Sequence, residues 1–256
     1  MFTYRSSNHR LSYDVKGAGP PLVLLHGLSG SRLWWRKNIP MLSQHFTVYT
    51  VDLIGYGRSN FQTPLSFDES ADLLEGWLSS LELDSISLIG HSMGGQTAVH
   101  LVARHPSRVG KLVLAASSGM VRARLHEVAV KLGEVGLKGR RRFLPTVAFD
   151  ALRASPQNLY RSARAILSDD FRPLLLRIGC PTLLIWGASD VVVTQRMGEA
   201  HRLIADSRLE VIEGAGHNLM YDRPTSSRVC NLRAIVGTAL KNSTASSTVM
   251  SSTSAM

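Results

Sequence analysis

The sequence has few cysteines and no long apolar run, and each shortage argues against a class of protein. Two cysteines, Cys180 and Cys230, are too few for a disulfide framework or a zinc site built from cysteine clusters, so we interpret both as small core residues. No apolar stretch approaches the roughly 18 residues that a membrane span requires. The N-terminus, MFTYRSSNHR, has no apolar signal core. We therefore expect a cytoplasmic protein without stable membrane insertion.

Acidic side chains are also scarce. The chain has 19 Asp and Glu against 29 Lys and Arg, which gives a formal net charge of +10. Residues 119–172 hold 11 basic and 5 acidic side chains, so they carry +6 of the +10. A basic surface suits an acidic partner, a membrane surface or nucleic acid. Aromatic residues are not interleaved with the basic ones and no known nucleic-acid module is visible, so we expect no nucleic-acid partner.

Apolar strands and amphipathic helices alternate along most of the chain. After a short alternating strand from Leu11, runs typical of buried parallel strands are PLVLLHG, FTVYTVDLIGYGRS, SISLIG, KLVLAAS, PTLLIWG and RLEVIEG. Helices are predicted from a capping box at Ser66 and Glu69 to about Leu81, from Gln96 to His105, from about Thr194, and from Asp222 and Pro224 to about Leu240. This rhythm predicts an α/β fold with a mostly parallel central sheet and helices on both faces.

The strand pattern stops between Gly119 and Arg172, where basic helices replace it. Ser155 and Pro156 fit an N-cap and a first-turn proline. We interpret residues 119–172 as a short helical cap inserted into a core made of residues 1–118 and 173–240. The tail, residues 241–256, is rich in Ser and Thr, uncharged and aperiodic, which predicts disorder.

One serine lies where a strand gives way to a helix. Residues 87–99, SLIGHSMGGQTAV, contain Gly90-His91-Ser92-Met93-Gly94. This segment fits G-x-S-x-G, in which the serine occupies a strained turn and its hydroxyl stands above the sheet. The pattern alone is common by chance, but the strand before it and the helix after it favour a nucleophile over an ordinary turn serine.

A serine nucleophile needs a base, and the base needs a group that fixes its tautomer. His217 follows the last strand in VIEGAGHNLM, and Asp190 follows the preceding strand in LLIWGASD. The order Ser92, Asp190, His217 is expected for successive loops at the carboxyl edge of one sheet. Two alternatives stay open: His217 as an ordinary loop histidine, and Asp190 as the N-terminal charge of the helix near Thr194.

Backbone N–H groups facing the developing oxyanion complete such a site. We predict that Met93, at the start of the helix after Ser92, and Leu28, in LLHGLSGS, supply them. No His, Asp and Glu cluster has metal-ligand spacing, so we expect neither a metal nor another cofactor.

Five separately placed motifs together resemble the α/β-hydrolase fold family over about residues 10–240. They are His26-Gly27, Asp52-Leu53-Ile54-Gly55-Tyr56-Gly57-Arg58-Ser59, Gly90-His91-Ser92-Met93-Gly94-Gly95, Gly187-Ala188-Ser189-Asp190 and Gly216-His217. The resemblance implies Ser92 as nucleophile, Asp190 as acid and His217 as base, with the Leu28 and Met93 N–H groups as oxyanion donors. It also implies that Asp52 ties loops together, and we interpret His26 and His91 as structural rings.

The residue at the elbow separates chemistries within that family. Haloalkane dehalogenases and epoxide hydrolases carry aspartate there, whereas carboxylesterases, lactonases, carbon–carbon hydrolases and the carrier-protein methyl esterases of biotin synthesis carry serine. We therefore expect a serine hydrolase acting on a small-molecule carboxylic ester, with an anionic or carrier-bound substrate among the options. A carbon–carbon or enol-lactone hydrolase is one alternative, and a hydrolase-fold protein that binds a ligand or partner without turnover is another. We expect a monomer or a homodimer.

Five apolar side chains near these motifs are candidates either for the substrate pocket or for the core: Trp34, Trp35, Val191, Leu219 and Met220. The basic run KGRRR, residues 138–142, is either a solvated loop or a recognition site for carboxylate or phosphate.

Overall fold

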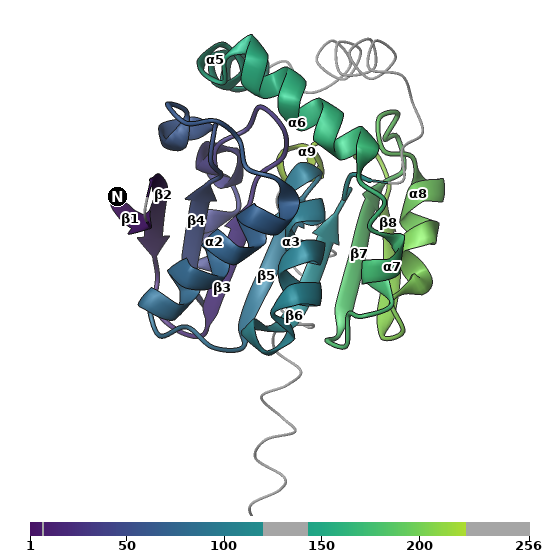
Figure 1. Cartoon of the computed structure of the whole chain (residues 1–256). Coiled ribbons are helices and arrows are strands. Elements are labelled where there is room, and N and C mark those ends of the chain that lie inside the picture. Colours follow the sequence, from purple (N-terminus) through teal and green to yellow (C-terminus); the bar gives the residue numbers. More distant parts are fainter. Residues whose placement is uncertain (7, 120–142, 224–256) are drawn as a thin grey trace, which may run out of the picture.

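A computed structural model describes residues 1–6, 8–119 and 143–223 (Figure 1). Within these residues, eight strands form one sheet in the order β1-β2-β4-β3-β5-β6-β7-β8. The strands are β1 (Phe2–Ser6), β2 (His9–Lys16), β3 (Pro21–Leu25), β4 (Thr47–Asp52), β5 (Ile86–His91), β6 (Val109–Ala115), β7 (Thr182–Gly187) and β8 (Ser207–Ile212). β2 pairs antiparallel with β1 and β4, and all other pairings are parallel. The predicted α/β class with a mostly parallel sheet is confirmed.

Helices connect the strands. The α-helices are α1 (Ile39–Leu42), α2 (Phe67–Ser80), α3 (Met93–Arg104), α5 (Leu144–Arg153), α6 (Pro156–Ser168), α7 (Arg172–Leu175), α8 (Gln195–Ala200) and α9 (Leu219–Asp222). Short 3-10 helices are η1 (Arg32–Trp35), η2 (Gly57–Ser59), η3 (Pro106–Arg108) and η4 (His201–Leu203). Ser66 caps α2 with the predicted capping box, because its hydroxyl accepts from Glu69 N–H while the Glu69 carboxylate accepts from Ser66 N–H.

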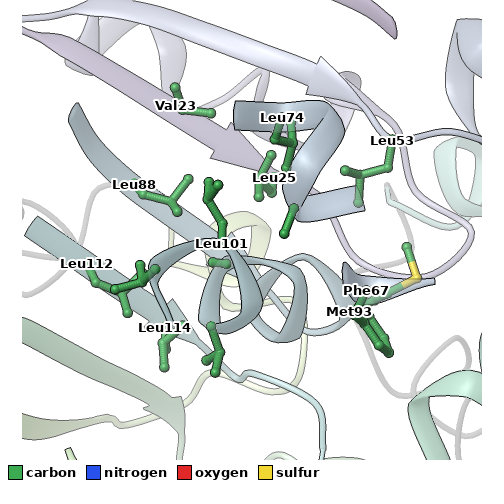
Figure 2. Close-up of a cluster of buried hydrophobic side chains, with 14 of the residues drawn as sticks. Val23, Leu25, Leu53, Phe67, Leu74, Leu88, Met93, Leu101, Leu112 and Leu114 are labelled. Atoms are coloured by element: carbon green, nitrogen blue, oxygen red, sulfur yellow. The ribbon is translucent and has the colours of Figure 1, made fainter. Parts of the chain in front are cut away.

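Both faces of the sheet are covered by apolar side chains. Successive residues of a strand point to opposite faces, so Leu112 and Leu114 of β6 join one core cluster while Val113 and Ala115 join the other. The first cluster packs α2 and α3 against the sheet, and part of it, from Val23 to Leu114, is drawn in Figure 2. The second contains Trp34 and Trp35 of η1 and residues of α9. This two-sided burial explains why the central strands read as continuous apolar runs.

Three expectations differ from the structure at the edges of elements. β1 precedes the first predicted strand, and sequence reasoning missed it although Phe2 and Tyr4 alternate with Thr3 and Arg5 along it. α3 begins at Met93 rather than Gln96, so Gly94 and Gly95 are helical despite their low helix propensity. Asp222 ends α9, and its carboxylate accepts from Gly216 N–H at 3.0 Å. The final helix predicted beyond it lies outside the described residues, as does the 241–256 tail.

Helices α5 and α6 lie across the carboxyl ends of the central strands (Figure 1). Ser155 opens α6 as predicted, because its hydroxyl accepts from Asn158 N–H. Asn158 then fixes α6 to the core by donating from Nδ2 to Gly55 O at 3.2 Å and to Gln62 O at 3.1 Å. The remainder of the proposed cap, residues 120–142 with its KGRRR run, lies outside the described residues, so the division into core and cap stays a prediction.

Candidate active site

Ser92 occupies the sharp turn between β5 and α3. Its φ of 50° and ψ of −117° lie in a region that residues with a Cβ adopt only under strain. Close packing around the turn requires glycine, since a Cβ on Gly94 would lie 2.5 Å from His26 O and 2.7 Å from Leu25 O. The start of α3 is thereby held against the end of β3, with the Ser92 hydroxyl at the carboxyl edge of the sheet.

The structure brings Ser92, His217 and Asp190 together. His217 Nε2 lies 3.1 Å from Ser92 Oγ, and His217 Nδ1 lies 2.8 Å from Asp190 Oδ2. All three residues are buried, with 8%, 5% and 6% of their surface exposed for Ser92, His217 and Asp190. Because Asp190 Oδ2 accepts a hydrogen bond from His217 Nδ1–H, Nε2 can accept the proton of the Ser92 hydroxyl. This arrangement can turn a serine hydroxyl into a nucleophile.

Asp190 is anchored by its other oxygen. Oδ1 accepts from Val192 N–H at 2.9 Å and from Val193 N–H at 3.0 Å. Those amides belong to the turn before α8, whose N-cap residue is Thr194. The carboxylate therefore contacts both its own turn and His217, and it precedes the N-cap of α8 by four residues.

Two backbone N–H groups, those of Leu28 and Met93, are the predicted oxyanion donors. Met93 is the first residue of α3, and Leu28 lies in the turn after β3 that the Gly30 N–H to Gly27 O bond of 3.0 Å closes. Neither N–H donates to an acceptor within the described part of the chain. A helix N-terminus and a free turn amide both favour negative charge.

Buried polar side chains form hydrogen bonds with the loop after β3, which carries Leu28. His26 donates from Nδ1 to Gly27 O at 2.8 Å and accepts from Leu53 N–H through Nε2 at 3.0 Å. Burial lowers the pKa of His26, which agrees with a neutral, structural ring. Asp52 accepts from the N–H groups of Arg32 and Arg58 at 2.7 and 2.9 Å and from the Arg32 guanidinium at 2.6 Å. Asp52 thus joins two loops, as the resemblance implied.

His91 contacts the backbone of the proposed base. Its Nε2 donates to His217 O at 2.9 Å, and the two rings lie 5.0 Å apart. Burial, followed by the neighbouring His217, holds the pKa of His91 well below its usual value, so the ring stays neutral. His91 therefore positions the His217 loop without adding a charge beside the base.

Of the five candidate pocket residues, four are buried: Trp34, Trp35, Leu219 and Met220. These four belong to one cluster with Phe143, whose ring lies 5.3 Å from that of Trp34. Val191 is 38% exposed and lies outside that cluster. Contact of any of the five with substrate stays a prediction.

Sequence reasoning missed Asp150, a carboxylate of α5 that is 1% exposed. Its Oδ2 accepts from Ser31 Oγ at 2.8 Å and from Trp34 Nε1 at 3.0 Å. Burial raises the pKa of this carboxyl. The sequence does show that Asp150 is the one acidic residue of the mainly apolar segment LPTVAFDALR, but not what it contacts. Asp150 joins α5 to the loop that carries Leu28.

Residues 1–6, 8–119 and 143–223 contain neither a candidate membrane span nor a candidate metal site. No helix there is both long and apolar enough to cross a bilayer. No group of three His, Cys, Asp or Glu side chains there could hold a metal ion.

Comparisons with known proteins match most of the chain. The model of a family described as "alpha/beta hydrolase fold" matches residues 20–164. A pimeloyl-[acyl-carrier protein] methyl ester esterase of Nitrosospira multiformis is 31% identical over 214 residues, which is 71% of this chain and 81% of that protein.

Solved structures agree in fold. An esterase from Exiguobacterium antarcticum superposes with a TM-score of 0.78 at 24% identity, covering 90% of this chain and 96% of that one. An enol-lactonase from Burkholderia xenovorans gives the same TM-score and identity, covering 91% of this chain and 99% of that one.

Proposed function

This chain belongs to the α/β hydrolase fold family, and on that premise we propose that it is a serine hydrolase that cleaves a carboxylic ester through an acyl-enzyme. The observation that carries the proposal is the continuous contact from Asp190 Oδ2 through the His217 ring to Ser92 Oγ, with separations of 2.8 and 3.1 Å. The 31% identity to a methyl ester esterase supports an ester as the substrate.

The acylation step uses all three side chains. Ser92 Oγ attacks the ester carbonyl carbon as its proton passes to His217 Nε2. The carbonyl oxygen becomes an oxyanion, which the N–H groups of Leu28 and Met93 stabilise. When the C–O bond breaks, the imidazolium returns its proton to the departing alkoxide, and the alcohol leaves.

Deacylation repeats the same chemistry with water. His217 Nε2 accepts a proton from water as the water oxygen attacks the acyl carbon, and it then protonates Ser92 Oγ as that bond breaks. The acid leaves and the serine is regenerated. The role of Asp190 in both steps is to hold the Nδ1–H tautomer of His217 and to stabilise the imidazolium.

The acyl group is proposed to be anionic or carrier-bound. The relative at 31% identity is named for an ester on an acyl-carrier protein. This chain carries a net charge of +10, and residues 119–172 account for more than half of it. A cationic surface raises the encounter rate with an anionic substrate or an acidic carrier.

Initial rates on p-nitrophenyl esters from acetate to decanoate test the proposal. We expect hydrolysis by the wild type and by Ser80→Ala, a matched change at an exposed helix end, and loss of hydrolysis in Ser92→Ala. Rates on lactones and vinylogous diketones measured beside them separate the other serine chemistries of the fold. Turnover of a diketone or lactone far above that of every ester would contradict ester cleavage, and equal ester rates in Ser92→Ala would contradict the nucleophile.

A further inference from the structure

The exposed face of α5 is apolar. The exposed residues of this helix are Pro145, Ala148, Phe149 and Leu152, at the spacing of one helix face. Phe149 is 53% exposed and Leu152 is 85% exposed. The only carboxylate of the helix, Asp150, lies on the buried side. α5 therefore exposes an apolar face to the outside, while Val147 on its other side packs against the second core cluster.

Phe61 extends this surface. It is 92% exposed and lies in the loop after η2. Its neighbours fix that loop to the junction of α5 and α6, because Asn60 Nδ2 donates to Arg153 O at 3.1 Å and Gln62 O accepts from Asn158 Nδ2 at 3.1 Å. We call Phe61, Pro145, Ala148, Phe149 and Leu152 the apolar face. Exposed apolar patches of this kind mark contacts with proteins or membranes.

Arginines border the apolar face. The Arg153 guanidinium lies 5.3 Å from the centre of the Phe149 ring. Arg161 donates to Thr63 Oγ1 at 3.3 Å, beside Phe61, and shares an open groove of about 530 Å³ with Arg164 and Tyr160. Residues 143–168 contain one acidic side chain, Asp150, and it is buried. No carboxylate of α5 or α6 therefore neutralises this border.

We propose that the apolar face docks onto an anionic lipid surface. Phe61, Phe149 and Leu152 would enter the boundary between headgroups and acyl chains, as the apolar sides of interfacial helices do. Arg153, Arg161 and Arg164 would then lie at the level of the phosphates, which guanidinium groups bind well. The docking requires no helix that spans the bilayer.

Charge and exposure favour lipid over the other occupants. A second copy of this chain would bring two arginine borders together, which is unfavourable. An acidic protein would satisfy the arginines, but it would also need an apolar pocket for side chains as exposed as Phe61 and Leu152. An anionic bilayer supplies both phosphates and hydrocarbon.

The docking surface is connected to the candidate active site. The buried side of α5 holds Ser31 and Trp34 through Asp150, so the helix that would touch lipid also contacts the loop of Leu28. Lipid binding does not depend on the chemistry of Ser92, so it can be tested separately from the proposed ester cleavage.

Co-sedimentation of the full chain with vesicles tests the proposal. We expect binding to vesicles made of equal parts phosphatidylglycerol and phosphatidylcholine, and weaker binding at high salt. Phe149→Ser/Leu152→Ser should reduce the partition coefficient at least about tenfold, because two large apolar side chains no longer enter the bilayer. Arg161→Glu/Arg164→Glu should reduce it by a similar factor. The matched controls Leu176→Ser and Arg177→Glu, which change exposed residues of the same types elsewhere, should bind as the wild type does.

Several results would overturn the proposal. The proposal is wrong if the wild-type protein does not co-sediment with anionic vesicles, or if the apolar-face variants bind them as strongly as the wild type does. Binding to an acidic carrier protein but not to vesicles would assign the surface to a protein partner. Loss of a wild-type dimer in Phe149→Ser/Leu152→Ser, seen by light scattering, would assign it to a second copy. A large drop in the melting temperature of Phe149→Ser/Leu152→Ser would show that the apolar face is covered by the chain itself.

Discussion

Asp190 uses its two carboxylate oxygens for different tasks. Oδ1 orders the turn before α8 through two backbone N–H groups, and Oδ2 contacts His217 Nδ1 at 2.8 Å. Only the second contact bears on proton transfer, because it decides which ring nitrogen carries the proton.

Asp190→Asn should therefore separate folding from reactivity. An asparagine can keep its oxygen on the turn amides, but its amide group would then donate to Nδ1 and force the proton onto Nε2. We expect kcat for ester hydrolysis to fall by about 10⁴ with little change in KM. The melting temperature should stay close to that of the wild type. A kcat within a few-fold of wild type would contradict the assigned role of Asp190.

Asp150 shows a different use of a buried carboxylate. It accepts hydrogen bonds from Ser31 and Trp34, and its pKa is raised by burial. Its contacts cross from α5 to η1, so it fixes the helix to the loop that follows β3.

Replacing Asp150 should lower the free energy of unfolding by more than the loss of one hydrogen bond would. Asp150→Ala leaves the Trp34 N–H and Ser31 hydroxyl buried and unpaired, so we expect the free energy of unfolding to fall by about 1–3 kcal/mol for each donor that water does not reach. In urea unfolding of Asp150→Ala, Ser31→Ala and the double variant, the two changes should be non-additive by at least about 0.5 kcal/mol. Strict additivity would show that the Asp150–Ser31 contact contributes nothing to stability.

At the scale of elements, α3 is held from two sides by ionisable groups. His100, which is 6% exposed, places Nδ1 2.7 Å from Asp68 of α2 and Nε2 2.8 Å from Asp169 at the end of α6. Asp169 also accepts from Gln96 at 2.6 Å. Gln96 Oε1 accepts from Ser118 Oγ at 2.9 Å, and Ser118 N–H donates to Ser92 O at 3.1 Å. A chain of hydrogen bonds thus leads from α6 to the Ser92 turn.

The contacts of His100 with Asp169 and Asp68 predict that the free energy of unfolding depends on pH. Burial by itself lowers the pKa of His100, but hydrogen bonds to Asp169 and then Asp68 outweigh it, so the folded-state pKa is raised above 6.5. The stabilisation by charged His100 is therefore fully present below its unfolded-state pKa, near 6.5. It is lost as the pH rises through the folded-state pKa of His100.

Melting temperatures of wild type and His100→Gln should show this sign. We expect the difference between the two proteins to be larger at about pH 6 than at about pH 9. His105→Gln, a change at a more exposed histidine whose ring is hydrogen-bonded to Asp72, serves as the matched control and should alter stability less. A difference that grows toward high pH would contradict the charged state of His100.

Sequence alone could locate most of these elements because the buried strands are continuous apolar runs and Ser66 and Ser155 are explicit caps. It placed the start of α3 at Gln96, three residues late, because two glycines lower the helix propensity of the first turn. Gly94 is required there by the close approach to β3, and Gly95 by the close approach to Ser117. It also missed β1, which is five residues long and carries only Phe2 and Tyr4 as an alternating pattern. Asp150 was missed for a related reason: its partners are 119 and 116 residues away, and no local pattern records a contact at that separation.

At the scale of the whole molecule, the sheet assembles the site. Leu28, Ser92, Asp190 and His217 follow β3, β5, β7 and β8, and parallel strands end at the same edge. Ser92 and His217 are 125 residues apart in sequence and 3.1 Å apart in the fold. The motif order predicted this meeting point, whereas the hydrogen bonds that hold the loops there depend on tertiary packing.

If folding makes Ser92 a nucleophile, a fluorophosphonate should label it covalently in the folded protein alone. Intact mass and peptide mapping should show one adduct on folded wild type, at Ser92, and none on Ser92→Ala, on His217→Ala over the same time, or on wild type unfolded in urea. A folded wild type that stays unlabelled, or an adduct that maps to another serine, would contradict the account.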